Sequence, residues 1–458
     1  MTNGWKKING KWYYYQNGQA VTRWHKLRWS KGENWFFFAD TGVMVTGWQK
    51  LGWSGGTNWF YFDGNGAMLT GWQKLKWSKG TDWFYFDDTT GVMLTGNQYL
   101  EWQGKKDWYA FNDTTGAYMR KLAMQTGTTN PVYSVYVIDG SYKYNITDVV
   151  ENLELSQAEN QLAASATITM MNVKLPKYSE LRTYIKERDR VFIYASDGTK
   201  TEEVFRGYIW TKEYKQSTSD KTLQIKCFDN LIYFQESEES DYYSSGSSTQ
   251  TVMSSICKKW GVTMKYNYLS IKHSKLALRG NLADIITSDI LDKVRERTGK
   301  KYVISSVKDV LQIDQIGSNT VLYSIKAGEN AVSTQTVVTM DGMITRVKIL
   351  GKADDDDRRP VEAVVSKNTS KYGTLQKLID KDKDTSLADA KKEANAMLQE
   401  NSTPKHEYTV TAPDIPWIKK GDQVMVQAGD INKTLIVAGI SHEISTKAKK
   451  MDLTLTDQ

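Results

Sequence analysis

The chain has 458 residues, which is too many for one ordinary hydrophobic core and predicts two to four domains. Its 40% apolar content is that of a globular rather than a disordered chain, and its net charge of +7 is modest. The first 120 residues carry 14 Lys and Arg against 9 Asp and Glu. This small excess of positive charge is much less than nucleic-acid-binding proteins carry.

Targeting signals and cysteine chemistry are both weak in this sequence. The first residues, MTNGWKKINGKW, form no apolar signal region, and no run reaches the roughly 18 apolar residues of a membrane helix. We therefore expect a protein that stays in the cytoplasm unless a route other than general secretion releases it. Cys227 and Cys257 lack the spacing of a metal site or a disulfide framework, and we expect both to be small core residues.

Residues 1–120 form a tryptophan repeat, because 13 of the 16 Trp lie before Arg120. Each unit predicts a β-hairpin, with an aromatic strand such as WQKLGW, the turn SGGTN and a second strand WFYF. One hairpin cannot bury its own face, so the repeats predict a β-hairpin solenoid. The Trp residues recur at intervals of 24 in three sets: Trp24, Trp48, Trp72; Trp29, Trp53, Trp77; and Trp35, Trp59, Trp83.

The repeat resembles the choline-binding, or cell-wall-binding, repeat family, because Gly47-Trp48 precedes the quartet 59–62 (WFYF) and Gly71-Trp72 precedes the quartet 83–86 (WFYF). The resemblance implies aromatic cages between hairpins that hold choline of teichoic acids, or glucans. A quaternary ammonium is attracted to Trp faces. A purely structural or docking role for these rings is the equal alternative. The candidate ligand-binding residues are Trp24, Trp35, Trp48, Trp59, Tyr61, Trp72, Trp83 and Tyr85.

Two positions depart from the family pattern. Arg23 replaces the Gly before Trp24, and Asn97 replaces the Trp after Gly96. The most complete cages are therefore expected to use Trp48, Trp59, Trp72 and Trp83.

After a linker over 121–131, strand signals dominate residues 132–240. Hairpins are predicted around Asp139-Gly140 and around Asp197-Gly198, and LAASATITMM and TLQIKCFD add alternating strands. Together they predict a first small antiparallel barrel.

Over residues 241–330 the spacing of apolar residues changes from the alternation of strands to the period of helices. This change predicts an α+β insert. One helix is expected from Thr249 to Trp260 with Gly261 as its stop. A second amphipathic helix begins at Leu282, after the cap Asn281, and ends at Gly299.

Residues 331–458 return to strands and predict a second barrel with a helical excursion. The strands are ITRVKILG, HEYTVTA, DQVMVQ, KTLIVAGI and MDLTLTD. The helix lies near Leu387 to Leu398, where Ser386 and Asp389 have capping-box spacing. The loop ADDDDRRP holds four consecutive Asp without the alternation of a calcium loop, which favours a solvated loop over a metal site.

The chain is therefore predicted to be mainly β with an α+β insert. This order resembles the baseplate-hub family of contractile phage tails, especially PBSX-type prophage hubs and the T-even phage hub. The resemblance covers most of the chain and is carried by VVENLELSQAENQLAASATITM, GYIWTKEYKQSTSDKTLQIKCFDNLIYF, DIITSDILDKVRERTGKKYVIS and KKEANAMLQENSTPKHEYTVTAPDIPWIKKGDQVMV.

What the hub resemblance implies is mechanical. It implies two tube-like β-barrel domains per subunit and a homotrimer that mimics the six-fold ring of the tail tube. Such a hub joins the tube to a three-fold spike, so the tail tube protein, the spike or tip protein and other baseplate proteins are its partners. The particle is assembled in the bacterial cytoplasm and released by lysis.

No active site is evident in the sequence. His25, His273, His406 and His442 lack metal-ligand spacing, and no nucleophile or phosphate-loop motif occurs. We therefore expect no catalytic residue, metal or cofactor, and interpret His442-Glu443 as a surface pair. The alternatives are a cell-wall hydrolase targeted by the repeats, with paired carboxylates as its site, and an adhesin.

Overall fold

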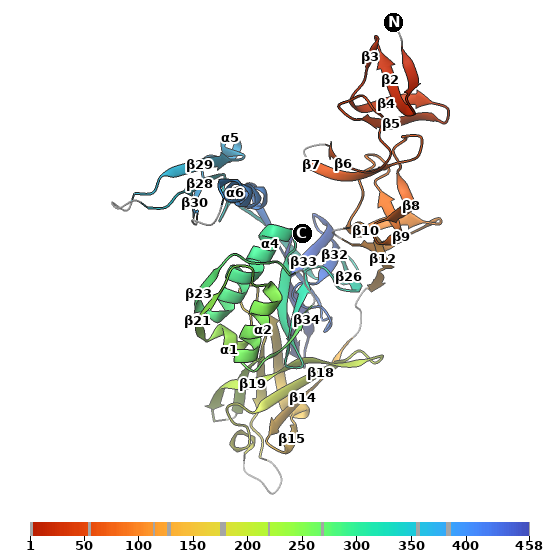
Figure 1. The fold of residues 1–458 in the computed structure, drawn as a ribbon. Coiled ribbons are helices and arrows are strands. Elements are labelled where there is room, and N and C mark those ends of the chain that lie inside the picture. Colours follow the sequence, from red (N-terminus) through yellow and green to blue (C-terminus); the bar gives the residue numbers. More distant parts are fainter. Residues whose placement is uncertain are drawn as a thin grey trace. The chain divides into compact units, whose positions relative to one another are not determined.

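The computed structural model describes residues 3–53, 56–112, 115–125, 130–174, 180–218, 220–266, 270–353, 358–381 and 386–457. The chain divides into two units, residues 1–124 and 125–458. Strands dominate both units and helices are few (Figure 1), which confirms the predicted mainly β class with an α+β insert. The four Asp of ADDDDRRP, residues 354–357, lie outside the described residues.

The N-terminal unit is a series of antiparallel hairpins, as the repeat pattern predicted. Trp29 pairs with Gly32, and Trp77 pairs with Gly80, so only two residues form each of these turns. The strands of this part of the chain are β1 (Gly4–Ile8), β2 (Lys11–Gln16), β3 (Gln19–Ala20), β4 (Arg23–Trp29), β5 (Gly32–Phe38), β6 (Gly47–Trp53), β7 (Gly56–Phe62), β8 (Gly71–Trp77), β9 (Gly80–Phe86), β10 (Gly96–Trp102), β11 (Lys105–Phe111), β12 (Tyr118–Lys121) and β13 (Ala123–Gln125).

Phenylalanines, rather than tryptophans, are the most deeply buried residues of the repeats. The segment that follows each hairpin returns to the preceding hairpin, where Met68 N donates to Trp35 O at 2.9 Å and Met93 N donates to Trp59 O at 2.9 Å. Gly66 has φ +81°, and a Cβ there would lie 2.3 Å from Met44 Sδ, so only glycine fits this contact. The phenylalanines with no exposed surface are Phe36, Phe38, Phe60, Phe62, Phe84 and Phe86.

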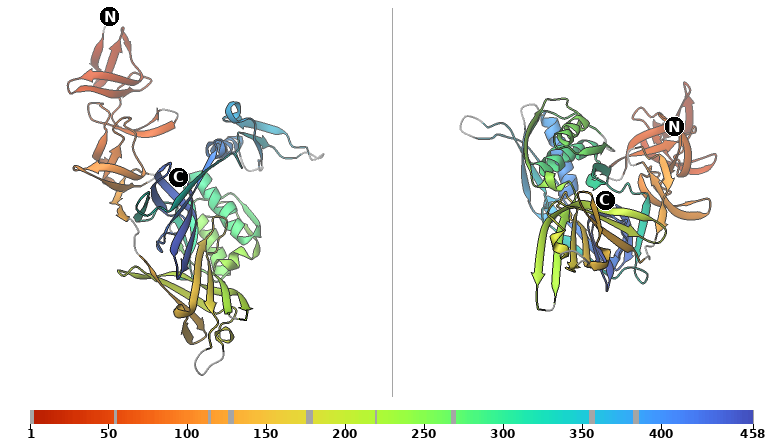
Figure 2. Two further views of the ribbon diagram at one scale, coloured as in Figure 1. Left: turned by 180° about the vertical axis from the view of Figure 1, so that it is seen from behind. Right: turned by 90° about the horizontal axis from the view of Figure 1, so that it is seen from below.

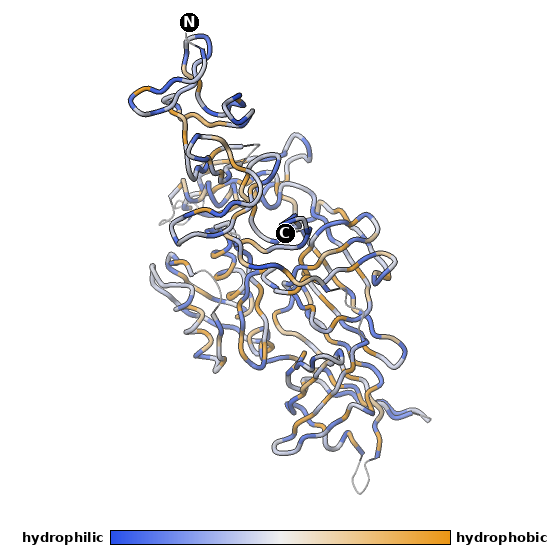
Figure 3. Tube along the Cα trace, turned by 90° about the vertical axis from the view of Figure 1, so that its right-hand side faces the viewer, coloured by the Kyte–Doolittle hydropathy of each residue, from blue (hydrophilic) through white to orange (hydrophobic). Residues whose placement is uncertain are grey.

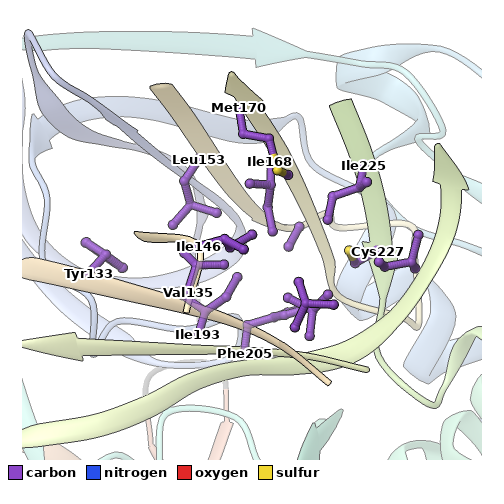
Figure 4. Close-up of a cluster of buried hydrophobic side chains, with 14 of the residues drawn as sticks. Tyr133, Val135, Ile146, Leu153, Ile168, Met170, Ile193, Phe205, Ile225 and Cys227 are labelled. Carbon is purple, nitrogen blue, oxygen red and sulfur yellow. The ribbon is translucent and has the colours of Figure 1, made fainter. Parts of the chain in front are cut away.

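The second unit begins with an antiparallel sheet that we call the first β unit. Apolar and polar residues alternate along its strands (Figure 3), so one face of each strand reaches a common core. Figure 4 shows that Val135, Ile168, Ile193 and Ile225 point toward one another in this core. The strands are β14 (Val132–Asp139), β15 (Tyr142–Asn145), β16 (Val150–Gln157), β17 (Ser165–Met171), β18 (Arg190–Ser196), β19 (Thr201–Gln216) and β20 (Lys221–Phe228), with short 3-10 turns η1 (Thr147–Val149) and η2 (Leu181–Thr183).

The α+β insert follows β20, and both of its predicted helices are confirmed. Ser248 caps the first helix by accepting from Thr251 N, and Asn281 caps the second by accepting from Ala283 N. The second helix ends at Gly299, which has φ +71°. The elements are α1 (Ile232–Gln235), β21 (Glu238–Tyr243), α2 (Thr249–Lys259), β22 (Thr263–Tyr266), β23 (Leu276–Asn281), α3 (Leu282–Asp284), the π-helical η3 (Ile285–Leu291), α4 (Asp292–Thr298), β24 (Tyr302–Val307) and β25 (Val310–Gln315).

A second β unit closes the chain, with a core of its own. Its strands are β26 (Val321–Lys326), β27 (Ser333–Thr339), β31 (Lys405–Pro413), β32 (Gln423–Ala428), β33 (Ile431–Ser445) and β34 (Lys449–Thr456).

A small subdomain is inserted between β27 and β31. Its sheet has the order β29-β28-β30, and α6 packs on it through Ala390, Ala394 and Leu398. The predicted capping box is confirmed, because Ser386 Oγ accepts from Asp389 N at 3.1 Å. The predicted strand ITRVKILG lies in this separate sheet and not in the second barrel, because its apolar residues face α6. The elements are β28 (Arg346–Leu350), β29 (Val361–Ser366), α5 (Thr369–Tyr372), β30 (Gln376–Asp380) and α6 (Leu387–Asn401).

The two β units have the same strand order. The first runs β14-β18-β19-β20-β17-β16, and the second runs β26-β32-β33-β34-β31-β27. Each has one long strand, β19 with 16 residues and β33 with 15. Both long strands bulge at the same point of the register, between Ile209 and Thr211 in β19 and between Val437 and Gly439 in β33. One difference is that β14 is antiparallel to β18 whereas β26 is parallel to β32.

The turns that lead into β18 and β32 repeat the same contacts. Asp189 Oδ2 accepts from Lys186 N at 2.7 Å, and Asp422 Oδ2 accepts from Lys419 N at 3.0 Å. The carbonyl of each Asp also accepts the N–H of the residue that opens the bulge. The preceding residue is left-handed in both turns. The two β units are therefore copies of one structural motif.

The two copies are joined edge to edge within the chain. β16 pairs antiparallel with the second half of β33, with Leu155 opposite His442 and Gln157 opposite Ile440. The copies therefore share one continuous sheet. Within the described ranges, no helix combines the length and apolar character needed to cross a lipid bilayer.

Burial of Asp422 gives a testable pH dependence, because burial raises the pKa of this carboxyl to about 6. The folded state holds the proton more tightly than the unfolded state, so this stabilisation is complete below about pH 4 and is lost as the pH rises through about 6. Asp422→Asn keeps an oxygen for the Lys419 N–H but cannot titrate. We expect the free energy of unfolding of the wild type, relative to this variant, to fall between those two pH values.

Urea unfolding at several pH values measures this difference. Asp430→Asn, at an exposed position, is the control and should follow the wild type. Parallel pH profiles for the wild type and Asp422→Asn would contradict the expectation.

Candidate functional site

Three tryptophans from two successive hairpins form one aromatic cluster. Trp24 and Trp35 lie on the two strands of one hairpin, and Trp53 lies on the first strand of the next. The ring centroids are 6.4 Å apart for Trp24–Trp35, 4.9 Å for Trp24–Trp53 and 5.7 Å for Trp35–Trp53, and each pair meets edge to face. This geometry is favourable for aromatic rings.

The tryptophan of each Gly-Trp or Arg-Trp pair ties its hairpin to the next one. Its indole N–H donates to a backbone carbonyl on the first strand of the next hairpin. The acceptor is the residue that precedes the last Trp of that strand. The same ring packs on the buried phenylalanines of that hairpin, as in Trp48–Phe84 at 4.8 Å. This position therefore has a structural role. The recurring bonds are Trp24 Nε1 to Gly52 O at 3.1 Å, Trp48 Nε1 to Lys76 O at 3.1 Å and Trp72 Nε1 to Glu101 O at 2.8 Å.

Two tryptophans that begin an aromatic quartet, Trp59 and Trp83, each lie near a lysine ammonium. Trp59 is 39% exposed, and Lys50 Nζ lies 6.0 Å from its ring centroid. Trp83 is partly buried and has Lys74 Nζ at the same distance. These ring faces already meet a cation of their own chain, which is the chemistry that a quaternary ammonium would use.

The two candidate tyrosines differ in their surroundings. Tyr61 is partly buried and lies 5.2 Å from Trp48. Tyr85 is 7% exposed, and its hydroxyl donates to the Asp88 carboxylate. Burial and then the neighbouring Asp88 raise the pKa of Tyr85. Tyr61 is therefore the more available of the two to a ligand.

The structure groups the four best cage candidates differently from the expected set. Trp48 lies 6.3 Å from Trp59, whereas Trp72 and Trp83 both contact Trp102, at 4.0 and 5.2 Å. Trp102 and its equivalents were absent from the candidate residues. Trp29, Trp53 and Trp77 are 24 residues apart and Trp102 follows 25 residues later, which is the signal for this position. Ligand binding by these clusters stays a prediction.

The surface interpretation of His442 is wrong. His442 is 6% exposed, and its Nδ1 lies 2.7 Å from Oδ1 of Asp414, which is 1% exposed. The Tyr133 hydroxyl donates to the other oxygen of Asp414. Alternation along β33 turns His442 inward and its neighbour Glu443 outward, where Lys450 pairs with it at 2.9 Å. The three buried groups connect the first β unit with the second.

A cleft of about 630 Å³ in the second unit lies between the α3–α4 helix and the second β unit. Two charged residues of its lining, Arg295 and Asp292, lie 3.5 Å apart, and Lys301 in the lining pairs at 3.1 Å with Glu400 outside it. Lys420 Nζ donates to three carbonyls of the β16–β17 loop at 2.7–3.1 Å, and burial lowers its pKa. These groups stabilise the loops around the cleft.

Among the described residues, no three His, Cys, Asp or Glu gather closely enough to hold a metal ion. Cys227 and Cys257 are both buried, as predicted, and burial raises the pKa of Cys257 to about 11. Neither thiol is therefore ionised near neutral pH.

The fold of this chain is that of prophage tail proteins. The 43 kDa tail protein of prophage MuSo2 from Shewanella oneidensis is 14% identical, with a TM-score of 0.55 over 71% of this chain and 98% of that chain. The tail protein from Neisseria meningitidis MC58 is 13% identical, with a TM-score of 0.55 over 71% of this chain and 97% of that one. A search of curated proteins gives no match.

Family models match both parts of the chain. The YQBQ-like model matches residues 138–456, and the chain belongs to the YQBQ-like family. A cell wall binding repeat model matches residues 3–18 and 46–68, and the second of these segments contains Trp48, Trp53 and Trp59. CbpJ from Streptococcus pneumoniae is 29% identical over 31% of this chain and 39% of that chain, with a TM-score of 0.21.

Proposed function

We propose that this protein is the structural baseplate hub of a contractile phage tail or tail-like particle, of the PBSX type. Three chains form a ring that joins the six-fold tail tube to a three-fold spike. The tail tube protein, the spike or tip protein and other baseplate proteins are its partners. The particle is assembled in the bacterial cytoplasm and leaves the cell on lysis.

The observation that carries this proposal is the internal duplication. Each chain holds two β units with one strand order, the same bulge and the same Asp-containing turn. Three such chains present six similar units, which matches a six-fold neighbour, while the insert and the subdomain occur once per chain and keep the three-fold symmetry. The fold of the prophage tail proteins supports the same assignment.

The repeats give the hub a second, surface-binding part. They bind cell-wall teichoic acid or glycan through the tryptophan clusters, or dock against neighbouring baseplate proteins. The exposed ring of Trp59 favours the first role, because such a face attracts a quaternary ammonium. The match to a cell wall binding repeat supports it.

The proposed hub works by surface complementarity and catalyses no reaction. We therefore expect the full chain to leave purified cell walls intact. Clearing of those walls, abolished by a single Asp or Glu substitution, would instead favour the wall hydrolase.

Native mass spectrometry of the full chain with its tail tube protein tests the hub proposal. We expect complexes that contain three copies of the chain, because two β units per chain must match a six-fold ring. The tube protein alone is the control for its own ring size. A complex with six copies, or with one, would contradict the proposal.

A further inference from the structure

In the duplicated sheet of the second unit, β27 and the second half of β19 each have one edge that pairs with no described strand. β27 pairs on one side with β31 and has no strand on its other side. β19 pairs with β18 only as far as Tyr208, so residues 212–216 are paired on one side, with β20. In Figure 2, right, β19 and β20 extend as a lime-green hairpin away from the rest of this unit.

The equivalent strands of the two β units are already paired with each other inside the chain. β16 occupies the place in the first β unit that β27 occupies in the second, and β33 is the equivalent of β19. The second half of β33 holds β16. The pairing of β16 with β33 is therefore a model for a pairing of β27 with β19, which the single chain does not make.

The register of the open junction follows from the repeated motif. Counted from the shared bulge, Tyr214 of β19 is equivalent to His442 of β33. Thr336, opposite Tyr408 of β31, is equivalent to Leu155, opposite Ala166 of β17. Leu155 pairs with His442. By this equivalence, Thr336 would pair with Tyr214.

We propose that β27 of one chain pairs antiparallel with residues 212–216 of β19 of a second chain. This inference rests on the proposed ring for the number of chains, but the strands and their register come from the duplicated fold. Around the closed sheet, the β16–β33 pair within a chain then alternates with the β27–β19 pair between two chains. The pairs opposite each other are Val338 and Lys212, Val337 and Glu213, Thr336 and Tyr214, Gln335 and Lys215, and Thr334 and Gln216.

The chemistry of β27 agrees with a strand that is covered in the assembly. Natural edge strands avoid uncontrolled pairing by carrying charged residues or proline. β27 reads STQTVVT and has neither. Val337 and Val338 are 41% and 58% exposed. The opposite edge carries Lys212, Glu213 and Lys215, so the protective charges lie on only one of the two strands.

Engineered cysteine pairs in the full chain test the register. Gln335→Cys combined with Lys215→Cys places two thiols directly opposite each other, on one face of the new pair of strands. Both positions are exposed, and the native thiols Cys227 and Cys257 are buried. Under mild oxidation in the presence of the tail tube protein, we expect disulfide-linked chains up to three on a non-reducing gel.

The control is Thr336→Cys combined with Lys215→Cys, because neighbouring residues of a strand point to opposite faces. We expect this variant to lose the linked species while its assembly mass is unchanged. A three-chain assembly in which the in-register pair stays unlinked, or in which the control links equally well, would overturn this pairing and leave the hub function standing. Chains that never associate, with or without the tube protein, would overturn both.

Discussion

Phe60→Ala is expected to unfold the stack of hairpins around β7. Phe60 has no exposed surface, and its ring lies 4.8 Å from Trp24 and 6.2 Å from Trp53. Removing a buried phenylalanine costs about 3–5 kcal/mol, because the cavity left behind cannot be refilled. A thin stack has little other core to absorb that loss.

Trp59→Ala is the matched control, because it changes the residue directly before Phe60 on the same strand. Trp59 is 39% exposed, and its indole takes no part in the recurring bonds between hairpins. We expect a loss of about 2 kcal/mol in the free energy of unfolding, smaller than that of Phe60→Ala because much of the ring is already in water. If the accessible ring face binds a quaternary ammonium, the same variant weakens choline binding by roughly 1–2 kcal/mol.

Urea unfolding of the full chain, followed by tryptophan fluorescence, measures the first effect. Calorimetric titration with choline measures the second. Equal destabilisation by Phe60→Ala and Trp59→Ala would contradict the separation of core and accessible rings. A folded wild type that gives no heat with choline at tens of millimolar would remove choline as the ligand and leave a glycan or a protein neighbour.

Asp414→Ala is expected to destabilise the second unit strongly. Asp414 is 1% exposed and holds the buried side chains of His442 and Tyr133. Its removal leaves two buried polar groups without a partner, which costs about 3–5 kcal/mol. Burial and the Asp414 charge raise the pKa of Tyr133, so its hydroxyl remains a donor at all ordinary pH values.

Asp430→Ala is the control for this variant. Asp430 is exposed and accepts from the Thr336 hydroxyl at 3.0 Å, and exposed positions of this kind change stability by about 0.5 kcal/mol or less. Thermal unfolding of both variants gives the comparison. Similar melting temperatures for the two would show that the Tyr133–Asp414–His442 network does not hold the copies together.

Local signals in the sequence predicted much of this fold. The Asp-Gly turns at 139–140 and 197–198 lie in observed hairpins. Asn281 and Ser386 cap the helices that they were expected to cap. These features depend on neighbours within a few residues, so their energetics are visible in a short stretch of chain.

The features that the sequence did not predict depend on long-range contacts. Trp53 meets Trp24 across two hairpins, and Tyr133 and His442 meet the same Asp414 from opposite ends of the second unit's sequence. The duplication is carried by backbone features, such as the bulge and the left-handed residue before each Asp, where Arg188 stands in one copy and Gly421 in the other. The hub resemblance implied two barrels, but because side chains at equivalent positions differ this much, the equivalence of individual residues becomes visible only in the strand pairing.

In the proposed hub, three chains supply six equivalent β units to one ring. Electron microscopy of the full chain assembled on its tail tube, averaged without imposed symmetry, tests it most directly. We expect six similar β densities around the channel next to the tube, with the α+β insert and the β28–β30 subdomain each seen three times. A ring with six inserts, or with three β densities, would contradict it.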